Sequence, residues 1–463
     1  MLFSVSHCEM ARIRFNLFFF AAIILLHLTQ LLVFPLAVIL NATILSHCRL
    51  HYKCLARKTF AIILILVTQI FAPTRLVLTA DDSFDLAHAV HRDTHGTIVG
   101  LDLPSHSIIM ANHQIYADWL YIWSLAYLAD IHSALIIILK ASLKWVPLVG
   151  PAMQMFSFIF LNRSWATDKK ELLDQLDTLA ADTRHPDVPA LDKIGLLIFP
   201  EGTLVSALTR PMSARYAAKS GIDDLKHCLL PRSTGSLFCL RALSRKVPTL
   251  QLIDLTIGYP GVPADGYGQD YYTLQSIFGH GRPPPKVHIH IKLIPVSAIP
   301  IGTFPSPADQ AVAAQQEAKG TTPKRAEIVD PSPDEVARFD AWLRALWADK
   351  DALLASFYKY GRFDPPPMAS PDTPSSEKLA VKELPAGELP EKLLAGELPV
   401  EKLLAGELPE KLLADSLPSG ADKGPFECPI RLKSSLDLIR TALLTVPGLS
   451  LLLYISNRLF FRP

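Results

Sequence analysis

The sequence predicts an α/β fold in which a mixed β-sheet is covered by helices. Between residues 96 and 300, apolar runs of strand length recur, and helical patterns such as 168–181 separate several of them. Strands that alternate with helices favour a sheet with helices packed on its faces. Long apolar runs lie outside this region, near both ends of the chain, and predict added membrane segments.

The runs that predict strands are 97–101, 107–111, 135–139, 156–161, 195–199, 249–257 and 287–294. The last one alternates apolar and polar residues between positions 287 and 292, which is typical of a half-buried strand. His288 and His290 share one of its faces. Because no third metal ligand accompanies them, we interpret this face as solvated rather than as a metal site.

Residues 15–45 are almost free of charge. A helix needs about 20 apolar residues to span a bilayer, and a signal peptide has a core of only about 7–15, so this run predicts a membrane span. The runs 60–78 and 436–461 are weaker candidates because prolines and arginines interrupt them; a buried or interfacial helix is the alternative for both. We therefore assign residues 1–85 and 426–463 to membrane segments.

Basic residues flank the first of these runs on both sides. Arg12 and Arg14 precede it, and residues 47–58, which we expect to form a loop before the second run, contain four Arg or Lys residues. Positive charges favour the cytosolic side for both flanks, which is incompatible with a single crossing. A re-entrant hairpin would reconcile the two.

The C-terminal third divides into a helix and a repetitive segment. Residues 334–360 have helical periodicity and predict a helical extension, 311–364, packed on the α/β domain. Residues 365–425 are rich in Pro, Ser, Glu and Lys and repeat the motif Gly-Glu-Leu-Pro every nine or ten residues. These units are shorter than the roughly 20–50 residues of solenoid repeats, and each contains a helix-breaking proline. We interpret this segment as a disordered linker.

His113 and Asp118 are the most informative pair in the chain. They follow the predicted strand 107–111 and open a predicted helix. Residues five apart are not stacked neighbours within a helix. If His113 lies in the turn before the helix, however, the carboxylate can reach back to the imidazole and make it a general base for a hydroxyl. A helix cap and a surface polar residue are the alternative, which the spacing alone favours.

Further polar residues follow the other predicted strands or lie in nearby turns. They are Lys140, Arg163, Glu201, Gly202, Thr203 and Arg232. If the sheet is largely parallel, these turns converge at the carboxyl ends of the strands, where α/β sheets bind ligands. A base, a carboxylate and several cations suit a phosphate-bearing substrate with a free hydroxyl. Taken singly, each is better explained as a surface salt-bridge residue or an ordinary turn.

The residues Asn112-His113-Gln-Ile-Tyr-Ala-Asp118, followed by the Phe-Pro-Glu-Gly-Thr turn at 199–203, resemble the glycerolipid acyltransferase family. The resemblance covers roughly residues 90–310 and implies a glycerol-3-phosphate acyltransferase-like fold for a domain that we place at 86–310. The sequence around His113 is most similar to that of the fungal branch associated with phosphatidylinositol remodelling. Gln114 and Tyr116 depart from the commoner Arg-Ser motif that follows the histidine in the family. The motif therefore does not identify the head group of the acceptor.

The resemblance also implies roles for the candidate residues. His113 would be the general base and Asp118 the residue that orients it. Arg163 and the turn Glu201-Gly202-Thr203 would hold the glycerol-phosphate part of the acceptor. Arg232 lies in a block similar to the family's Leu-Pro-Arg-x-x-Gly segment, and we place it with Lys140 among the substrate-binding residues.

The implied activity is transfer of a fatty acyl group from acyl-CoA to the free hydroxyl of a lysophospholipid, of the lysophosphatidic acid or lysophosphatidylinositol type. We expect an integral membrane protein of the endoplasmic reticulum that contacts the lipid bilayer and uses no cofactor, no metal and no nucleic acid. The chain has neither a G-x-S-x-G elbow nor a P-loop, consistent with direct transfer from an activated thioester. A CoA-independent phospholipid transacylase and an inactive membrane scaffold are the alternatives.

Overall fold

The computed structural model describes residues 10, 12–25, 42–147, 149–162, 164–182, 192–302, 331–363 and 425–439 of the 463-residue chain. An eight-stranded sheet organises these residues, with the strand order β10-β1-β9-β8-β4-β7-β5-β6. Its strands are β1 (Arg75–Ala80), β4 (His106–Ala111), β5 (Leu135–Lys140), β6 (Ile159–Leu161), β7 (Ile194–Ile198), β8 (Gln251–Gly258), β9 (Lys286–Pro295) and β10 (Phe426–Pro429). A separate hairpin pairs β2 (Val90–Arg92) with β3 (Ile98–Leu101).

Five neighbouring strands form a parallel core. β4 pairs in parallel with β7 and β8, and β5 pairs in parallel with β7 and β6. The carboxyl ends of these five strands therefore meet at one edge of the sheet. The outer strands add antiparallel pairs, β8 with β9 and β1 with β10, so the prediction of a mixed sheet is confirmed.

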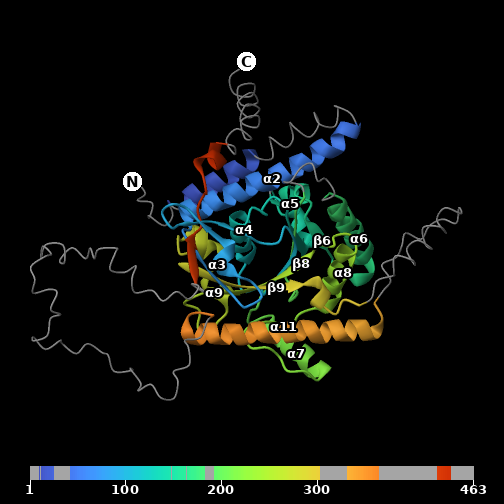
Figure 1. Cartoon of the computed structure of the whole chain (residues 1–463). Coiled ribbons are helices and arrows are strands. Elements are labelled where there is room, and N and C mark those ends of the chain that lie inside the picture. The colour runs from blue at the N-terminus through green and yellow to red at the C-terminus, as the bar shows by residue number, and fades with distance from the viewer. Residues whose placement is uncertain are drawn as a thin grey trace, which may run out of the picture. The chain divides into compact units, whose positions relative to one another are not determined.

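Helices cover the sheet. They are α2 (Ala42–Phe71), α3 (Leu86–Ala89), α4 (Asp118–Leu128), α5 (Val149–Met155), α6 (Trp165–Asp182), α7 (Arg210–Ser220), α8 (Ser233–Ser244), α9 (Gly268–Tyr271) and α11 (Pro333–Tyr360). Figure 1 shows α2 and α4 above the sheet and α11 below it. The predicted helices 168–181 and 334–360 are thus both present, as α6 and α11.

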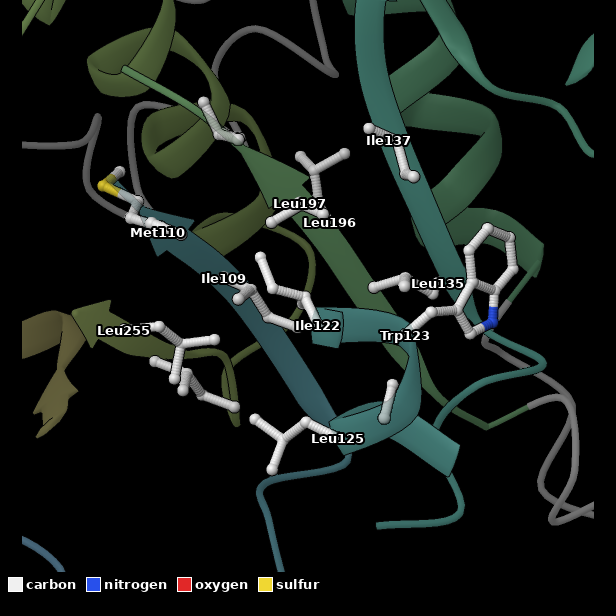
Figure 2. Packing of buried hydrophobic residues seen from close by; sticks show 14 of the residues in the cluster. Ile109, Met110, Ile122, Trp123, Leu125, Leu135, Ile137, Leu196, Leu197 and Leu255 are labelled. Carbon is white, nitrogen blue, oxygen red and sulfur yellow. The ribbon is translucent and has the colours of Figure 1, made fainter. Parts of the chain in front are cut away.

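Helix α4 packs on the parallel strands through apolar side chains. Figure 2 shows Ile122, Trp123 and Leu125 of α4 beside Ile109 of β4 and Leu135 of β5. These side chains are at most 3% exposed. Burial of a large apolar side chain contributes about 1.5–3 kcal/mol, so α4 is held firmly against the sheet. Its first residue, Asp118, is fixed with it.

All the predicted strand runs contain a strand, although 97–101 joins the small hairpin rather than the main sheet. Strand β7, at 194–198, shows why the apolar runs predicted the strands. Every residue of β7 is buried, because the strand lies in the middle of a parallel sheet with both faces covered. A strand in that position is a continuous apolar run.

The N-terminal region departs from the prediction in two ways. Residues 47–58 are part of helix α2 and do not form a loop between two spans. The second apolar run, 60–78, does not form one span either, because its last residues belong to strand β1 at positions 75–80. Pro73 and Thr74, between α2 and β1, mark the change from helix to strand.

Only one helix in the described residues, Lys53–Phe71, is long and apolar enough to cross a bilayer. Two thirds of its most apolar stretch is buried inside the protein. A buried core helix meets the same criterion. Of the first apolar run, residues 15–25 are helical, 42–45 begin helix α2, and 26–41 lie outside the described residues. The repeat segment 365–425 lies outside them too, apart from its last residue.

The C-terminal region also contributes to the sheet. Strand β10 pairs with β1, and residues 435–439 are helical, while 440–463 lie outside the described residues. The sheet thus includes one strand from each of the segments 1–85 and 426–463 that the sequence assigns to the membrane. Strands β1 and β10 therefore lie outside the range 86–310 in which the sequence places the α/β domain.

The face of β9 that carries His288 and His290 is not solvated. Both residues are 8% exposed. The His290 imidazole lies 3.0 Å from the Thr79 hydroxyl, and the His288 ring lies 5.0 Å from the ring of Phe357 at the end of α11. The interpretation as a solvated face was wrong because a helix distant in sequence covers it. No group of three metal-ligating side chains occurs in the part of the chain that the structure describes.

Candidate functional site

The turn between β4 and α4 brings His113 and Asp118 together. The Nδ1 atom of His113 lies 2.8 Å from Oδ2 of Asp118. The histidine side chain is 19% exposed, whereas the carboxylate is completely buried. The predicted contact is therefore present, with the imidazole at the surface and the carboxylate behind it.

The Asp118 carboxylate is surrounded by hydrogen-bond donors. Its Oδ2 also accepts from the backbone N–H groups of Gln114, at 2.7 Å, and Ile115, at 3.1 Å. Its Oδ1 accepts from the hydroxyl of Tyr259 at 2.6 Å. A carboxylate only accepts hydrogen bonds, so Nδ1 of His113 must carry the hydrogen. This fixes the tautomer in which Nε2 has a free lone pair.

The Nε2 atom of His113 has no hydrogen-bond partner among the described residues and is not enclosed. It is thus available to a molecule outside the protein. One face of the ring is covered by Phe199, whose ring centroid lies 4.2 Å away in a stacked arrangement. The stack and the Asp118 bond together restrict the ring to one orientation.

Two residues tie the turn to the neighbouring strand β8. The Asn112 side chain donates to the carbonyl of Ile257 at 3.0 Å and accepts from its N–H at 2.8 Å. Tyr259 directly follows β8 and holds Asp118 from the same side. Burial raises the pKa of the Tyr259 hydroxyl well above its ordinary value, so the hydroxyl remains a neutral donor.

Glu201 lies in the turn after strand β7 and contacts the His113 turn. Its Oε1 accepts from the backbone N–H of His113 at 3.2 Å and from Nε1 of Trp347 at 3.3 Å. Its Oε2 accepts from the N–H of Leu229 at 3.2 Å. Burial raises the pKa of Glu201 to about 8, while these three donors act in the opposite direction.

The placement of Glu201 corrects the role expected for it. The residue is 2% exposed, and its carboxylate contacts groups of the protein itself. Glu201 therefore positions the His113 turn, where the sequence had suggested contact with the acceptor.

Gly202 and Arg232 lie side by side. Gly202 has a φ of 71°, in the left-handed region that favours glycine, and a Cβ added there would lie 3.6 Å from Nε of Arg232. The Arg232 N–H donates to the carbonyl of Pro200 at 2.8 Å, which ties the start of α8 to the turn after β7. Arg232 is exposed and Thr203 is half-buried.

Lys140 belongs to a strand farther from His113. Lys140 is exposed and ends β5, and strand β7 separates β5 from β4. Strands are about 4.8 Å apart, so Lys140 is roughly 10 Å from the β4 turn. Arg163 lies outside the described residues. Its neighbours Asn162 and Ser164 both donate to the buried carboxylate of Asp168.

The two residues that distinguish this chain's motif have different surroundings. Gln114 is buried, and its side chain donates to the carbonyl of His227 at 3.0 Å. Tyr116 is 56% exposed. Gln114 is thus an internal support of the turn, and of the two only Tyr116 is available to a substrate.

The sequence did not indicate Tyr259 or Trp347 as parts of the site. Tyr259 is 141 positions from Asp118, and Trp347 is 146 positions from Glu201. Nothing in their local sequence separates them from ordinary core residues. The position of Tyr259 immediately after an apolar run was the one available signal, since residues at the ends of parallel strands gather at the ligand-binding edge.

Comparison with known proteins relates this geometry to a chemistry. The model of the acyltransferase family matches residues 100–258. The 2-acyl-1-lysophosphatidylinositol acyltransferase of Saccharomyces cerevisiae is 31% identical over 71% of this chain and 80% of the yeast protein. An uncharacterized acyltransferase of Schizosaccharomyces pombe is 31% identical over 67% of this chain and 75% of its own length.

More distant similarities follow. Lysocardiolipin acyltransferase 1 of Danio rerio is 28% identical over 56% of this chain and 55% of that protein. The crystal structure of the 1-acyl-sn-glycerophosphate acyltransferase from Thermotoga maritima aligns with 67% of this chain at 14% identity, and its TM-score of 0.34 is too low to support an argument.

Proposed function

Since this chain belongs to the acyltransferase family that includes the lysophospholipid and 1-acylglycerol-3-phosphate acyltransferases, we propose that it esterifies the free hydroxyl of a lysophospholipid with a fatty acyl group from acyl-CoA. One observation supports this most strongly. The buried carboxylate of Asp118 holds Nδ1–H of His113 and leaves Nε2 as a free acceptor at the surface.

In the proposed reaction, Nε2 of His113 takes the proton of the lysophospholipid hydroxyl as its oxygen attacks the thioester carbon. The tetrahedral intermediate then expels the CoA thiolate, which receives the proton from the imidazolium. The ester bond forms as the thioester bond breaks, so no covalent enzyme intermediate is required. A positioned base contributes a factor of about 10²–10⁴ to the rate.

Asp118 has two tasks in this mechanism. It keeps the imidazole in the tautomer that can accept a proton, and its negative charge stabilises the imidazolium formed during transfer. Tyr259 and the N–H groups of Gln114 and Ile115 hold the carboxylate in place for both tasks.

The acceptor would bind at the carboxyl edge of the parallel strands. Arg232 is exposed beside Gly202 and next to the His113 turn, and Lys140 ends a strand of the same edge. Together with Arg163, these cations suit the phosphate of a lysophospholipid. Thr203 adds a hydroxyl near Gly202 in the same turn.

The name of the yeast relative makes lysophosphatidylinositol the first acceptor to test, and lysophosphatidic acid the second. We propose that the protein acts as an integral membrane protein of the endoplasmic reticulum. The apolar runs at both ends of the chain and the amphiphilic character of both substrates support attachment to a membrane.

The test is an acyl-transfer assay with membranes that contain the protein. Labelled acyl-CoA is added with one lysophospholipid at a time, and the labelled product is separated by head group. We expect a diacyl product with lysophosphatidylinositol or lysophosphatidic acid. A parallel incubation without any CoA species uses labelled lysophospholipid, and diacyl product formed there would show a transacylase instead. Absence of transfer to every acceptor in both incubations would favour an inactive scaffold.

A further inference from the structure

We propose that helix α11 is part of the catalytic apparatus, in which Trp347 and Asp351 act as positioning residues for the His113 turn. The helix (Pro333–Tyr360) lies outside the residues 100–258 that match the family model. The inference rests on the proposed role of His113 as the base. Neither Trp347 nor Asp351 contacts the His113 ring, so both act through other groups.

Trp347 provides the first connection. Its side chain is fully buried, and its Nε1 donates to Oε1 of Glu201 at 3.3 Å. The same oxygen accepts from the backbone N–H of His113 at 3.2 Å. One carboxylate oxygen therefore joins α11 directly to the backbone of the proposed base.

Asp351 provides a second connection one helical turn later. Its carboxylate accepts from three successive backbone N–H groups, those of Lys226 at 3.0 Å, His227 at 2.6 Å and Cys228 at 2.9 Å. Three charge-assisted bonds to one carboxylate fix the conformation of this loop.

The loop 226–229 forms hydrogen bonds with two residues that support the His113 turn, Gln114 and Glu201. The carbonyl of His227 accepts from the side chain of Gln114, which is next to His113. The N–H of Leu229, one residue after Cys228, donates to Oε2 of Glu201. The two connections from α11 thus reach the same turn. Trp347 acts through Glu201, and the loop held by Asp351 acts through Gln114 and, by way of Leu229, through Glu201.

Helix α11 is itself firmly anchored to strand β8. Lys350 is 1% exposed and forms an ion pair with Asp254 at 2.8 Å, and it donates to the carbonyl of Leu255 at 2.6 Å. Phe357 packs so closely on Gly258 that a Cβ there would lie only 2.9 Å from the ring. A helix fixed at several points along its length can hold Glu201 without moving.

The ends of the helix support the same conclusion. Ser332 and Glu335 form a capping box at its start, and Gly361, with a φ of 72°, ends it in the left-handed conformation. The helix is therefore defined over its whole length by its own sequence, in addition to its packing on β8.

The test uses Trp347→Phe, which keeps a buried aromatic ring but removes the N–H donor together with part of the indole. Trp342→Phe is the matched control, because it makes the same exchange on the same helix at a half-buried ring that packs on Phe339. We expect kcat to fall about tenfold in W347F with little change in KM, as one hydrogen bond to a buried carboxyl group is lost. W342F should retain wild-type values.

The pH profile separates positioning from a general structural role. The Trp347 bond lowers the pKa of Glu201, while burial and the nearby carboxylate of Asp118 raise it. Further ionisable groups in this region are His113, His227, the buried Cys228 thiol, Asp351, Lys350 and Arg210. The W347F exchange removes a hydrogen bond that favours the ionised form of Glu201. The pH at which kcat reaches half of its plateau should therefore move upward in W347F and stay unchanged in W342F.

A second pair of variants gives an independent answer if W347F fails to accumulate in membranes. Asp351→Asn removes the charge that orders the 226–228 loop, and Asp349→Asn makes the same exchange at a site 69% exposed on the same helix. We expect kcat to fall about tenfold in D351N alone. Wild-type kcat and pH profile in W347F, or equal kcat in D351N and D349N, would overturn the inference. A wild-type protein without acyl transfer would overturn the proposed function instead.

Discussion

Replacing Asp118 with Asn tests how much the buried charge contributes to the base. The two side chains have nearly the same size, and the Asn oxygen can take the place of Oδ2, which accepts from Nδ1 of His113 at 2.8 Å and from two backbone N–H groups. The Asn amide would then face the hydroxyl oxygen of Tyr259, which can accept a hydrogen bond. The geometry can therefore survive while the charge is lost.

The expected effect follows from the attraction between Asp118 and the imidazolium that forms during the reaction. With charge centres about 4 Å apart and an effective dielectric constant of about 20, this attraction is about 4 kcal/mol. Each 1.36 kcal/mol corresponds to a factor of ten in rate, so kcat should fall by about 10³. KM for the lysophospholipid should change little, because in the proposed mechanism the imidazolium charge forms only as the hydroxyl proton is transferred.

The assay measures initial rates of labelled acyl transfer in membranes at saturating acyl-CoA, over a range of lysophospholipid concentrations. Asp223→Asn, in an exposed loop position, controls for the loss of a carboxylate in general. Immunoblotting of the membrane fraction normalises the amount of protein. A D118N variant that retains more than about a tenth of the wild-type kcat would refute the electrostatic role assigned to Asp118.

Three further changes test the surroundings of the pair. Tyr259→Phe removes the donor to Oδ1 of Asp118 and should lower kcat about tenfold with KM unchanged in the same assay; an unchanged kcat would contradict the role of this bond. Glu201 has a pKa raised from 4.5 to about 8, so its contribution to stability is fully present below pH 4.5 and is lost as the pH rises through 8. Glu201→Gln should therefore reduce the loss of thermal stability between pH 5 and 8, measured by unfolding in detergent, and an equal loss in both proteins would count against the raised pKa. Lys140→Ala should raise KM for an anionic lysophospholipid about threefold without affecting kcat, as an exposed charge contributes little more; an unchanged KM would remove Lys140 from the binding site.

The parallel core of the sheet could be predicted from the sequence because its strands are buried on both faces. Runs such as 107–111 and 195–199 are continuously apolar for that reason, and their order along the chain alternates with helices. Strand β1 could not be recognised, because it follows the apolar helix α2 after a break of only a few residues. Strand β10 is short and pairs with a partner some 350 residues earlier, a contact that no local pattern indicates.

In the candidate site too, contacts between residues close in sequence could be predicted and contacts between distant residues could not. His113 and Asp118 are close in sequence, so their contact could be inferred from the strand, the turn and the helix between them. The partners that hold them, Tyr259 and Trp347, approach from strand β8 and helix α11 and become visible only in three dimensions. The expected role of Glu201 was wrong for a related reason: the sequence places it after a strand but does not show that its carboxylate is buried.

The central claim is that Nε2 of His113 removes the proton from the lysophospholipid hydroxyl. The most direct measurement compares acyl transfer from labelled acyl-CoA to lysophosphatidylinositol in membranes containing wild-type protein, His113→Ala or the surface control His88→Ala, at equal amounts of membrane-bound protein. We expect a loss of at least about 10²-fold in H113A and wild-type activity in H88A. Acyl transfer by H113A at a rate close to that of the wild type would contradict the claim.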